Sequence, residues 1–324
     1  MTTSRLPEAC DRLAQIQAGV ITRRQAIDGG MAGSSVEWLV GTGRWRTLQR
    51  GVYSIYTGEP PRMAVLWAAV LRAGPSAVLS HETAAELHQL YDRPSNLVHV
   101  SIPHDRSVVR VRGLVVHRSR MLATATHPAS LPPRTKIEQT VLDLASRAAS
   151  FDSAFAIASA ACQRRLTTPA RIQRAMDARS MLRWRGELAA ALAEIGSGVH
   201  SLLEYRYVRY VERPHGLPVA VRQAKVMVGE RVRYLDNLYD AFGVCVELDG
   251  RRAHPDDRLW MDDRRDNSNA VGGLVTLRYD WGAIESKRCA TAIEVAQVLR
   301  KRGWTGWVRP CGPGCAVNTN ARPI

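Results

Sequence analysis

The sequence has little of several features that would assign it to a membrane or secreted class. No run approaches the 18 or more apolar residues of a membrane-spanning helix. Residues 1–10 lack the apolar core of a signal peptide. The six cysteines are dispersed, at Cys10, Cys162, Cys245, Cys289, Cys311 and Cys315. This pattern is not that of a disulfide framework, and we expect a soluble protein of the reducing cytoplasm.

Negative charge is also scarce. Lys and Arg total 45 against 30 Asp and Glu, a formal net charge of +15, and the basic residues are overwhelmingly Arg. Guanidinium groups bind phosphates, which favours nucleic acid as the partner. A GC-rich genome produces the same Arg bias, so composition alone does not decide. A chain of 324 residues is long enough for two or three domains.

Three acidic side chains between residues 231 and 267 are predicted to face one point. Residues 226–228 and 231–235 are typical of two strands around a two-residue turn with Gly first. Asp236 then ends the second strand. Residues 240–243 have the composition of a type I turn, and residues 244–248 form a short apolar strand. The result is a three-stranded meander.

Counting outward from the turn places Asp236 opposite Glu247, with Cβ atoms about 5 Å apart. Asp249 lies on the same face, about 6.6 Å further along, and Gln223 lies across from Asp236 in the first hairpin. A bulge at Gly243 would shift this register by one residue. Ionised carboxylates this close repel, so a divalent cation, Mg²⁺ or Mn²⁺, held by Asp236 and Glu247 is the predicted compensation.

Asp236, the run Glu247-Leu248-Asp249-Gly250, His254 and the charged run 262–266 resemble the DUF559 family of PD-(D/E)XK nuclease-like domains. The very-short-patch mismatch repair endonucleases are related to this family. The resemblance covers roughly residues 199–304. It implies that Asp236 and Glu247 bind the metal, that Glu204 is the acidic residue of the preceding helix, and that His254 activates water. Asp249 stands where most of the superfamily has a lysine, although the DUF559 pattern has Asp there.

Each of these residues also has an ordinary structural interpretation. Asp236 is compatible with a turn, and Asp249-Gly250 with the turn that ends a strand. Ser201 to Glu204 fits a capping box, in which Glu204 only satisfies a helix N-terminus. His254, just before Pro255, fits a solvated loop. The combination favours the functional interpretation, but the alternatives stay open.

The first 60 residues predict a winged helix-turn-helix. Helices are expected over residues 7–18, over 23–28 with Thr22 as N-cap, and from Ser34 as N-cap through Val40. Residues 44–48 and 51–55 alternate like two strands of a basic wing.

Residues 19–26, Gly43-Arg44-Trp45 and residues 50–53 resemble the N-terminal domain of AbiEi-type antitoxins of type IV toxin–antitoxin systems. The resemblance implies binding to operator DNA. The contact candidates are Ser34, Ser35, Arg44, Arg46 and Arg50. Winged helices also mediate protein contacts, which is the alternative.

Residues 61–196 are predicted to be mostly helical, with a strand pair at 97–102 and 108–117 around His104-Asp105-Arg106. Residues 80–85 and 133–135 extend the AbiEi resemblance. Thr135 to Glu138 predicts a capping box that opens a helix to residue 149, and helices follow over 151–162, 169–178 and 186–195. His81 and Glu82 lack the second His of a metalloprotease motif and are interpreted as structural.

After the meander, the sequence predicts a helix over 257–270, a strand over 274–278 and a closing helix over 285–302. Residues 305–324 are expected to be an irregular tail. Cys311 and Cys315 are close enough to share a metal or a disulfide, but no further Cys or His follows them, which favours a disordered tail.

The predicted fold class is α+β or α/β and multidomain. It combines a winged helix at 1–60, an AbiEi-like middle region at 61–196 and a restriction-endonuclease-like mixed sheet with flanking helices at 197–304. One functional hypothesis is a Mg²⁺-dependent DNA endonuclease. The other is an antitoxin-like regulator with an inactive nuclease-like domain, whose partner is a nucleotidyltransferase toxin from a neighbouring gene.

Overall fold

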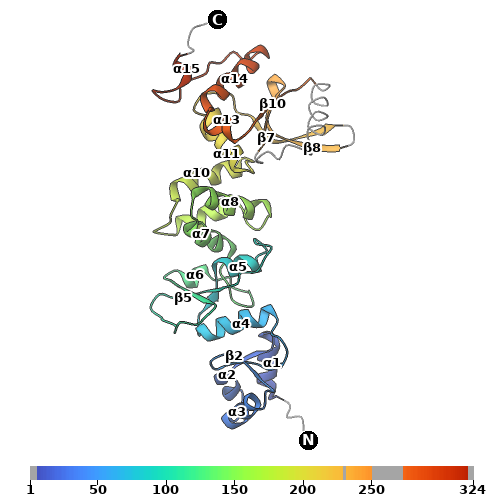
Figure 1. Cartoon of the computed structure of the whole chain (residues 1–324), viewed down its shortest axis with the longest axis vertical. Helices are drawn as coiled ribbons and strands as arrows, with labels where there is room; N and C mark the ends of the chain where they lie inside the picture. Colours follow the sequence, from blue (N-terminus) through green and yellow to red (C-terminus); the bar gives the residue numbers. More distant parts are fainter. Residues whose placement is uncertain (1–5, 229–230, 250–272, 320–324) are drawn as a thin grey trace. The chain divides into compact units, whose positions relative to one another are not determined.

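The computed structural model describes residues 6–228, 231–249 and 273–319 (Figure 1). The chain divides into two compact units. Unit 1 comprises residues 1–149 with 164–183, and unit 2 comprises residues 150–163 with 184–324. Helices and three small sheets make up the described parts, so the mixed α and β, multidomain expectation is confirmed. No helix among the described residues is long and apolar enough to cross a membrane.

The N-terminal part of unit 1 alternates helices with three short strands. Its elements are α1 (Glu8–Ile16), β1 (Val20–Thr22), α2 (Arg23–Asp28), α3 (Gly33–Gly41), β2 (Arg46–Gln49) and β3 (Val52–Ser54). The sheet has the order β1-β3-β2 with antiparallel pairing. Cys10, Ile21, Val36 and Trp45 pack in its core. Thr22 caps α2 through a capping box with Gln25, as expected for the N-cap.

One strand was not predicted, and one expectation is wrong. The strand β1 has only three residues and ends at Thr22, the N-cap of α2, so its sequence gives little signal. Ser34 is not the N-cap of α3: the backbone turns into the helix at Gly33, and the N-cap, Ala32, has no side-chain cap.

The remainder of unit 1 packs helices around a second sheet. Its elements are α4 (Arg62–Ala73), β4 (Val78–Leu79), α5 (His81–Leu87), β5 (Val98–Pro103), β6 (Leu114–Ser119), α6 (Leu122–Ala125), α7 (Ile137–Arg147) and α9 (Pro169–Asp177). The sheet order is β4-β5-β6. Ala64 and Trp67 of α4 share a hydrophobic cluster with Val20 and Val52, so the first 60 residues are packed onto α4.

The expected strand pair exists, but β5 and β6 run parallel and β6 begins only at Leu114. A parallel pair needs a crossover, which residues 104–113 provide in place of a tight hairpin turn. The prediction of a capping box at Thr135 is wrong. Lys136 is the N-cap of α7 without a side-chain bond, Thr135 Oγ1 lies 2.7 Å from Thr140 Oγ1, and Glu138 accepts a hydrogen bond from Thr167 instead.

Unit 2 holds a four-stranded mixed sheet covered by helices. Its elements are α8 (Phe151–Gln163), α10 (Arg185–Gly196), α11 (Leu202–Tyr207), the π-helical turn η1 (Val208–Glu212), β7 (Val221–Val228), β8 (Arg231–Tyr239), the 3₁₀ turn η2 (Asp240–Phe242), β9 (Val244–Leu248), β10 (Val275–Tyr279), α13 (Trp281–Glu285), α14 (Arg288–Lys301) and α15 (Ala316–Thr319). The sheet order is β10-β9-β8-β7. The first three strands in sequence pair antiparallel, and β10 pairs parallel with β9. Tyr207, Val246, Ile284 and Leu299 are among its core residues.

The closing helix expected over 285–302 is present as α14, and the short helix α13 precedes it. Two other details of unit 2 differ from expectation. β8 continues to Tyr239, so Asp236 lies inside the strand rather than at its end. The tail is not irregular throughout: Val308 packs against the core, and Arg309 N–H donates to the His215 carbonyl oxygen at 2.8 Å. The expected helix over 257–270 lies outside the described residues.

Candidate functional site

Four polar side chains from one helix and three strands of unit 2 form one cluster. Glu204 comes from α11, Gln223 from β7, Asp236 from β8 and Glu247 from β9. All four are at least partly buried. We call these four residues the acidic cluster.

Glu204 is held at the first turn of α11 by local hydrogen bonds. Ser201 caps the helix, since its Oγ accepts from Glu204 N–H at 3.1 Å. The carboxylate of Glu204 reaches back and accepts from His200 N–H at 3.0 Å. The capping role expected as an alternative is therefore present, but Glu204 also faces Gln223, so it does more than cap.

Gln223 links two of the carboxylates. Its Nε2 donates to Glu204 Oε2 at 3.3 Å and to Asp236 Oδ1 at 3.2 Å. The backbone of Gln223 is left-handed, with φ of 47°, a conformation that costs a non-glycine residue roughly 1–3 kcal/mol. The strand ladder resumes on both sides, at Arg222 with Asn237 and at Ala224 with Leu235. Such strain is typical of functional sites.

The predicted register of the β8–β9 hairpin is confirmed. Asn237 pairs with Val246, so the next pair along the ladder is Asp236 with Glu247. Gly243 closes the turn with φ of 59°, a conformation that glycine adopts readily, and no shift of register follows. Asp236 Oδ2 accepts from Leu248 N–H at 2.9 Å. Both oxygens of Asp236 thus accept hydrogen bonds.

The pKa values of two carboxylates in the acidic cluster, those of Glu204 and Glu247, are raised. Burial raises the pKa of Glu247, Asp236 raises it further, and Arg233 and Arg278 oppose the rise. Arg233 lies 3.6 Å from Glu247 Oε1. Burial also raises the pKa of Glu204, hydrogen bonding to His200 N–H opposes it, and the charge of Asp236 adds to it. Burial is the largest cause of both shifts, and the charge of Asp236 adds to each.

The donor set of the cluster is all oxygen, which fits Mg²⁺ or Mn²⁺. Gln223 now presents its amide N–H to the carboxylates, and turning the amide over would present its oxygen instead. Among the described residues, the one group of three or more His, Cys, Asp and Glu side chains with ligand atoms close enough to share an ion lies elsewhere in unit 2.

Of the two other predicted site residues, the structure describes Asp249. It lies just beyond β9 and is exposed, and its N–H donates to the Tyr279 carbonyl oxygen at 2.9 Å. His254 lies outside the described residues.

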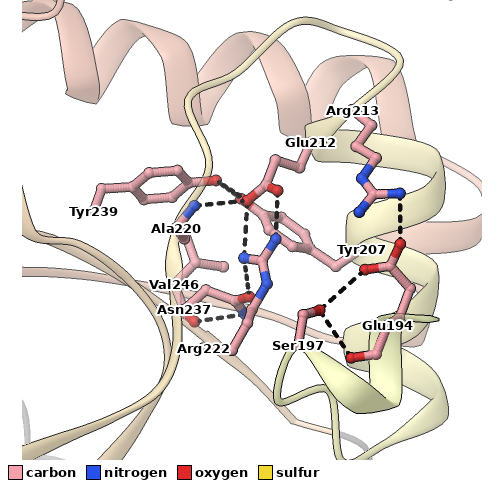
Figure 2. A network of polar contacts seen from close by, with 10 residues as sticks. All are labelled: Glu194, Ser197, Tyr207, Glu212, Arg213, Ala220, Arg222, Asn237, Tyr239 and Val246. Atoms are coloured by element: carbon pink, nitrogen blue, oxygen red, sulfur yellow. Dashed lines mark hydrogen bonds and ion pairs between the residues drawn. The ribbon is translucent and has the colours of Figure 1, made fainter. Parts of the chain in front are cut away.

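A second polar network on the alternate residues of the same strands was missed in the sequence. Glu212 and Arg222 form an ion pair with side chains only 1% and 6% exposed (Figure 2). Arg222 Nη1 also donates to Asn237 Oδ1 at 2.7 Å, and Tyr239 Oη donates to Glu212 Oε2 at 3.2 Å. Arg222 directly precedes Gln223, and Asn237 directly follows Asp236. This network therefore fixes the strands that carry the acidic cluster. The signal was a pair of adjacent polar residues in each strand, Arg222-Gln223 and Asp236-Asn237, since adjacent residues of a strand face opposite sides of the sheet.

The predicted DNA-contact residues all lie on the surface of unit 1. Ser34 and Ser35 are exposed in the first turn of α3, and Arg44, Arg46 and Arg50 are exposed around β2. The Arg44 guanidinium lies over the exposed Trp38 ring, 4.7 Å from its centroid.

A cleft of about 1260 Å³ in unit 1 adds basic residues to this set. Arg50 lines it together with Arg23, Arg24, Arg72 and Arg120. Asp28 is its one acidic lining residue among those described. The cleft is suited to a polyanion by charge.

Three histidines and Glu82 form a separate buried cluster in unit 1. The His81 and His117 rings stack with centroids 3.6 Å apart. His99 Nδ1 lies 2.9 Å from Glu82 Oε2 and 3.1 Å from His117 Nε2. Burial lowers the pKa of His81 to about 4 and that of His117 to about 3. The structural interpretation of His81 and Glu82 agrees with their packing.

Unit 1 is expected to lose stability as pH falls below 6.5. The unfolded chain binds protons at these histidines near pH 6.5, whereas folded His81 does so only near pH 4. Because the unfolded state binds more protons in this window, His81 alone should cost on the order of 2 kcal/mol by pH 5. Hydrogen exchange of α5 and β5 peptides across pH, corrected for intrinsic rates, measures the loss. His81→Asn should remove this part of the pH dependence, and a profile already flat in the natural chain contradicts the prediction.

Comparison with protein-family models finds no match for this chain, and comparison with curated proteins finds none either. The resemblances to the DUF559 and AbiEi families therefore rest on the motifs quoted above. The function has to be inferred from the arrangement of side chains.

Proposed function

We propose that the chain is a DNA-binding protein whose unit 2 carries a metal-dependent endonuclease site at Glu204, Gln223, Asp236 and Glu247. The observation that carries this proposal is the convergence of these side chains from α11, β7, β8 and β9, with Gln223 bridging Glu204 and Asp236. The fold of unit 2 supports it, because a mixed sheet with flanking helices is the layout that the resemblance to PD-(D/E)XK nucleases implies.

Asp236 and Glu247 would hold the cation. When bound, Mg²⁺ or Mn²⁺ would neutralise phosphate charge and lower the pKa of an attacking water. Glu204 orients Gln223 through the 3.3 Å hydrogen bond, and the left-handed backbone of Gln223 aims its amide at the cluster. Arg233, 3.6 Å from Glu247, limits the protonation of that carboxylate at neutral pH. His254 is assigned to water activation by resemblance alone.

DNA binding is assigned to unit 1. The order helix, strand, helix, helix, strand, strand with the sheet order β1-β3-β2 supports the winged-helix assignment. Exposed Ser34 and Ser35 lie at the start of α3, the position from which a recognition helix contacts base edges. Arg44, Arg46 and Arg50 are placed to contact phosphates beside it.

Nicking of supercoiled plasmid by the full chain tests the catalytic assignment. With Mg²⁺ or Mn²⁺ the natural chain should nick, and Asp236→Asn and Glu247→Gln should each reduce nicking to the level seen without metal. Asp240→Asn is the matched control, because Asp240 is an exposed acid of the same hairpin and should leave nicking unchanged. Nicking that survives both substitutions in the cluster rules out this site.

A second candidate function is a DNA-binding regulator without cleavage, akin to an antitoxin. It is favoured by Asp236, whose two oxygens already accept hydrogen bonds from Gln223 and Leu248, and by Asp249 at the position of the superfamily lysine. The partner implied by the AbiEi resemblance is a nucleotidyltransferase toxin. Specific operator binding without nicking in either ion, together with suppression of such a toxin by co-expression, would favour this function.

A further inference from the structure

A second group of ligand-type side chains gathers in unit 2, from segments far apart in the sequence. His215 follows η1, Cys289 lies in the first turn of α14, and Cys311 and Cys315 lie before α15. One ligand atom from each of the four lies within 4.8 Å of every other. We call these four residues the Cys₃His cluster.

His215 is fixed in the tautomer that a metal ligand needs. The side chain is fully buried, and its Nδ1–H donates to the Val211 carbonyl oxygen at 2.8 Å. The lone pair of the neutral ring is then on Nε2, which lies 3.7 Å from Cys315 Sγ. A backbone carbonyl behind the ring is a common second partner of metal-bound histidine.

The sulfur atoms lie at distances that suit a shared ion. Cys289 Sγ and Cys311 Sγ are 3.6 Å apart, and all three cysteines are free. Tetrahedral coordination with Zn–S distances of about 2.3 Å places two sulfurs about 3.8 Å apart. A disulfide would use two of the three sulfurs and leave the third beside His215, whereas one ion engages all four side chains.

The segment that carries Cys311 and Cys315 has few apolar contacts of its own. It is rich in Gly and Pro, and only Trp304 and Val308 among its described residues pack on the large apolar core of unit 2. Cys315 N–H donates to the Gly312 carbonyl oxygen at 3.1 Å, and Asn318 Nδ2 donates to the same oxygen at 3.2 Å. These bonds shape the turn but do not attach it to the rest of unit 2. One backbone bond, from Arg309 N–H to the His215 carbonyl oxygen, attaches the segment, and a metal cross-link would add a second, stronger attachment.

We propose that His215, Cys289, Cys311 and Cys315 bind one Zn²⁺ in a closed, structural site. Three thiolates and an imidazole are soft donors that select Zn²⁺ over Mg²⁺ or Ca²⁺. Four protein ligands leave no open position for substrate, so the role is structural. The ion joins residues 304–319 to α14 through Cys289 and to the loop after η1 through His215. This site is independent of the acidic cluster and of any nuclease activity.

Zinc content of the full chain, purified without chelator, tests the site. One Zn²⁺ per chain is expected, and Cys311→Ser and Cys315→Ser should each reduce zinc to about a tenth or less of that in the natural chain. Cys162→Ser is the matched control, because Cys162 is a free, half-buried cysteine of α8 in the same unit, and it should keep its zinc. Stoichiometric zinc in Cys311→Ser or Cys315→Ser overturns the assignment.

Two further measurements on the natural chain do not depend on the folding of variants. Cobalt exchanged for zinc should give a thiolate-to-cobalt charge-transfer band and the visible bands of a tetrahedral site. Alkylation of Cys289, Cys311 and Cys315 should be slow with zinc and fast after chelation, while the rate at Cys162 stays unchanged. The proposal is overturned by a Cys289–Cys311 disulfide in freshly purified protein. It is also overturned if added Zn²⁺ does not change the alkylation rates of the three thiols.

Discussion

Arg222→Met is expected to destabilise the sheet of unit 2 by about 3–5 kcal/mol, the cost of leaving a buried charge without its partner. Glu212 is 1% exposed and receives two hydrogen bonds from Arg222, one of them at 2.9 Å. Without the guanidinium, Glu212 retains Tyr239 Oη at 3.2 Å and the Ala220 N–H at 3.3 Å. Two neutral donors do not replace a cation, so Glu212 must bind a proton or the strand must open.

Lys225→Met on the same strand is the control. Lys225 is exposed, and its loss should change stability by no more than about 0.5 kcal/mol. Hydrogen exchange of β8 peptides in the full chain is the measurement, since it reports local opening without assuming that a chain of two units unfolds in one step. The double variant Glu212→Gln/Arg222→Met should recover part of the loss, because no unpaired charge remains buried. Equal protection in Arg222→Met and Lys225→Met would show that the ion pair contributes little.

Local rules predicted those parts of the site that depend on neighbouring strands. The pairing of Asp236 with Glu247 follows from period-two alternation once the turn at residues 240–243 is recognised, and Gly243 supplies the left-handed residue that closes it. The place of Gln223 across from Asp236 follows in the same way. The bridge from Gln223 to Glu204 needed the position of α11 against the sheet, which no local pattern encodes.

The errors share a physical cause, which is that tertiary contacts override local signals. Thr135 and Glu138 have the residue types of a capping box, but each finds a different partner in the folded chain, Thr140 and Thr167 respectively. The tail looked irregular because Cys311 and Cys315 have no ligand-type residue after them. Their neighbour His215 lies 100 residues earlier than Cys315, a separation that no spacing rule detects.

The affinity of the full chain for duplex DNA is expected to fall about 500-fold between 50 and 200 mM salt. This value assumes about five phosphate contacts by arginine, each of which adds about 0.9 to the slope of log affinity against log salt concentration. Arg44, Arg46 and Arg50 supply three of these contacts under the proposed assignment. Replacing all three by Ala should leave a fall of only about 12-fold over the same range. The affinity at low salt should fall as well, since fewer counterions are released.

Point substitutions are the right test because residues 1–60 cannot be removed cleanly. Val20 and Val52 share a hydrophobic cluster with Trp67 of α4, so a deletion would expose apolar surface in the remainder of unit 1. Arg12→Ala is the matched control: Arg12 is a 71% exposed arginine of α1 that does not line the basic cleft. It should keep the full salt dependence. A triple variant whose slope equals that of Arg12→Ala would place the DNA-binding surface elsewhere on the protein, because counterion release counts phosphate contacts regardless of base sequence.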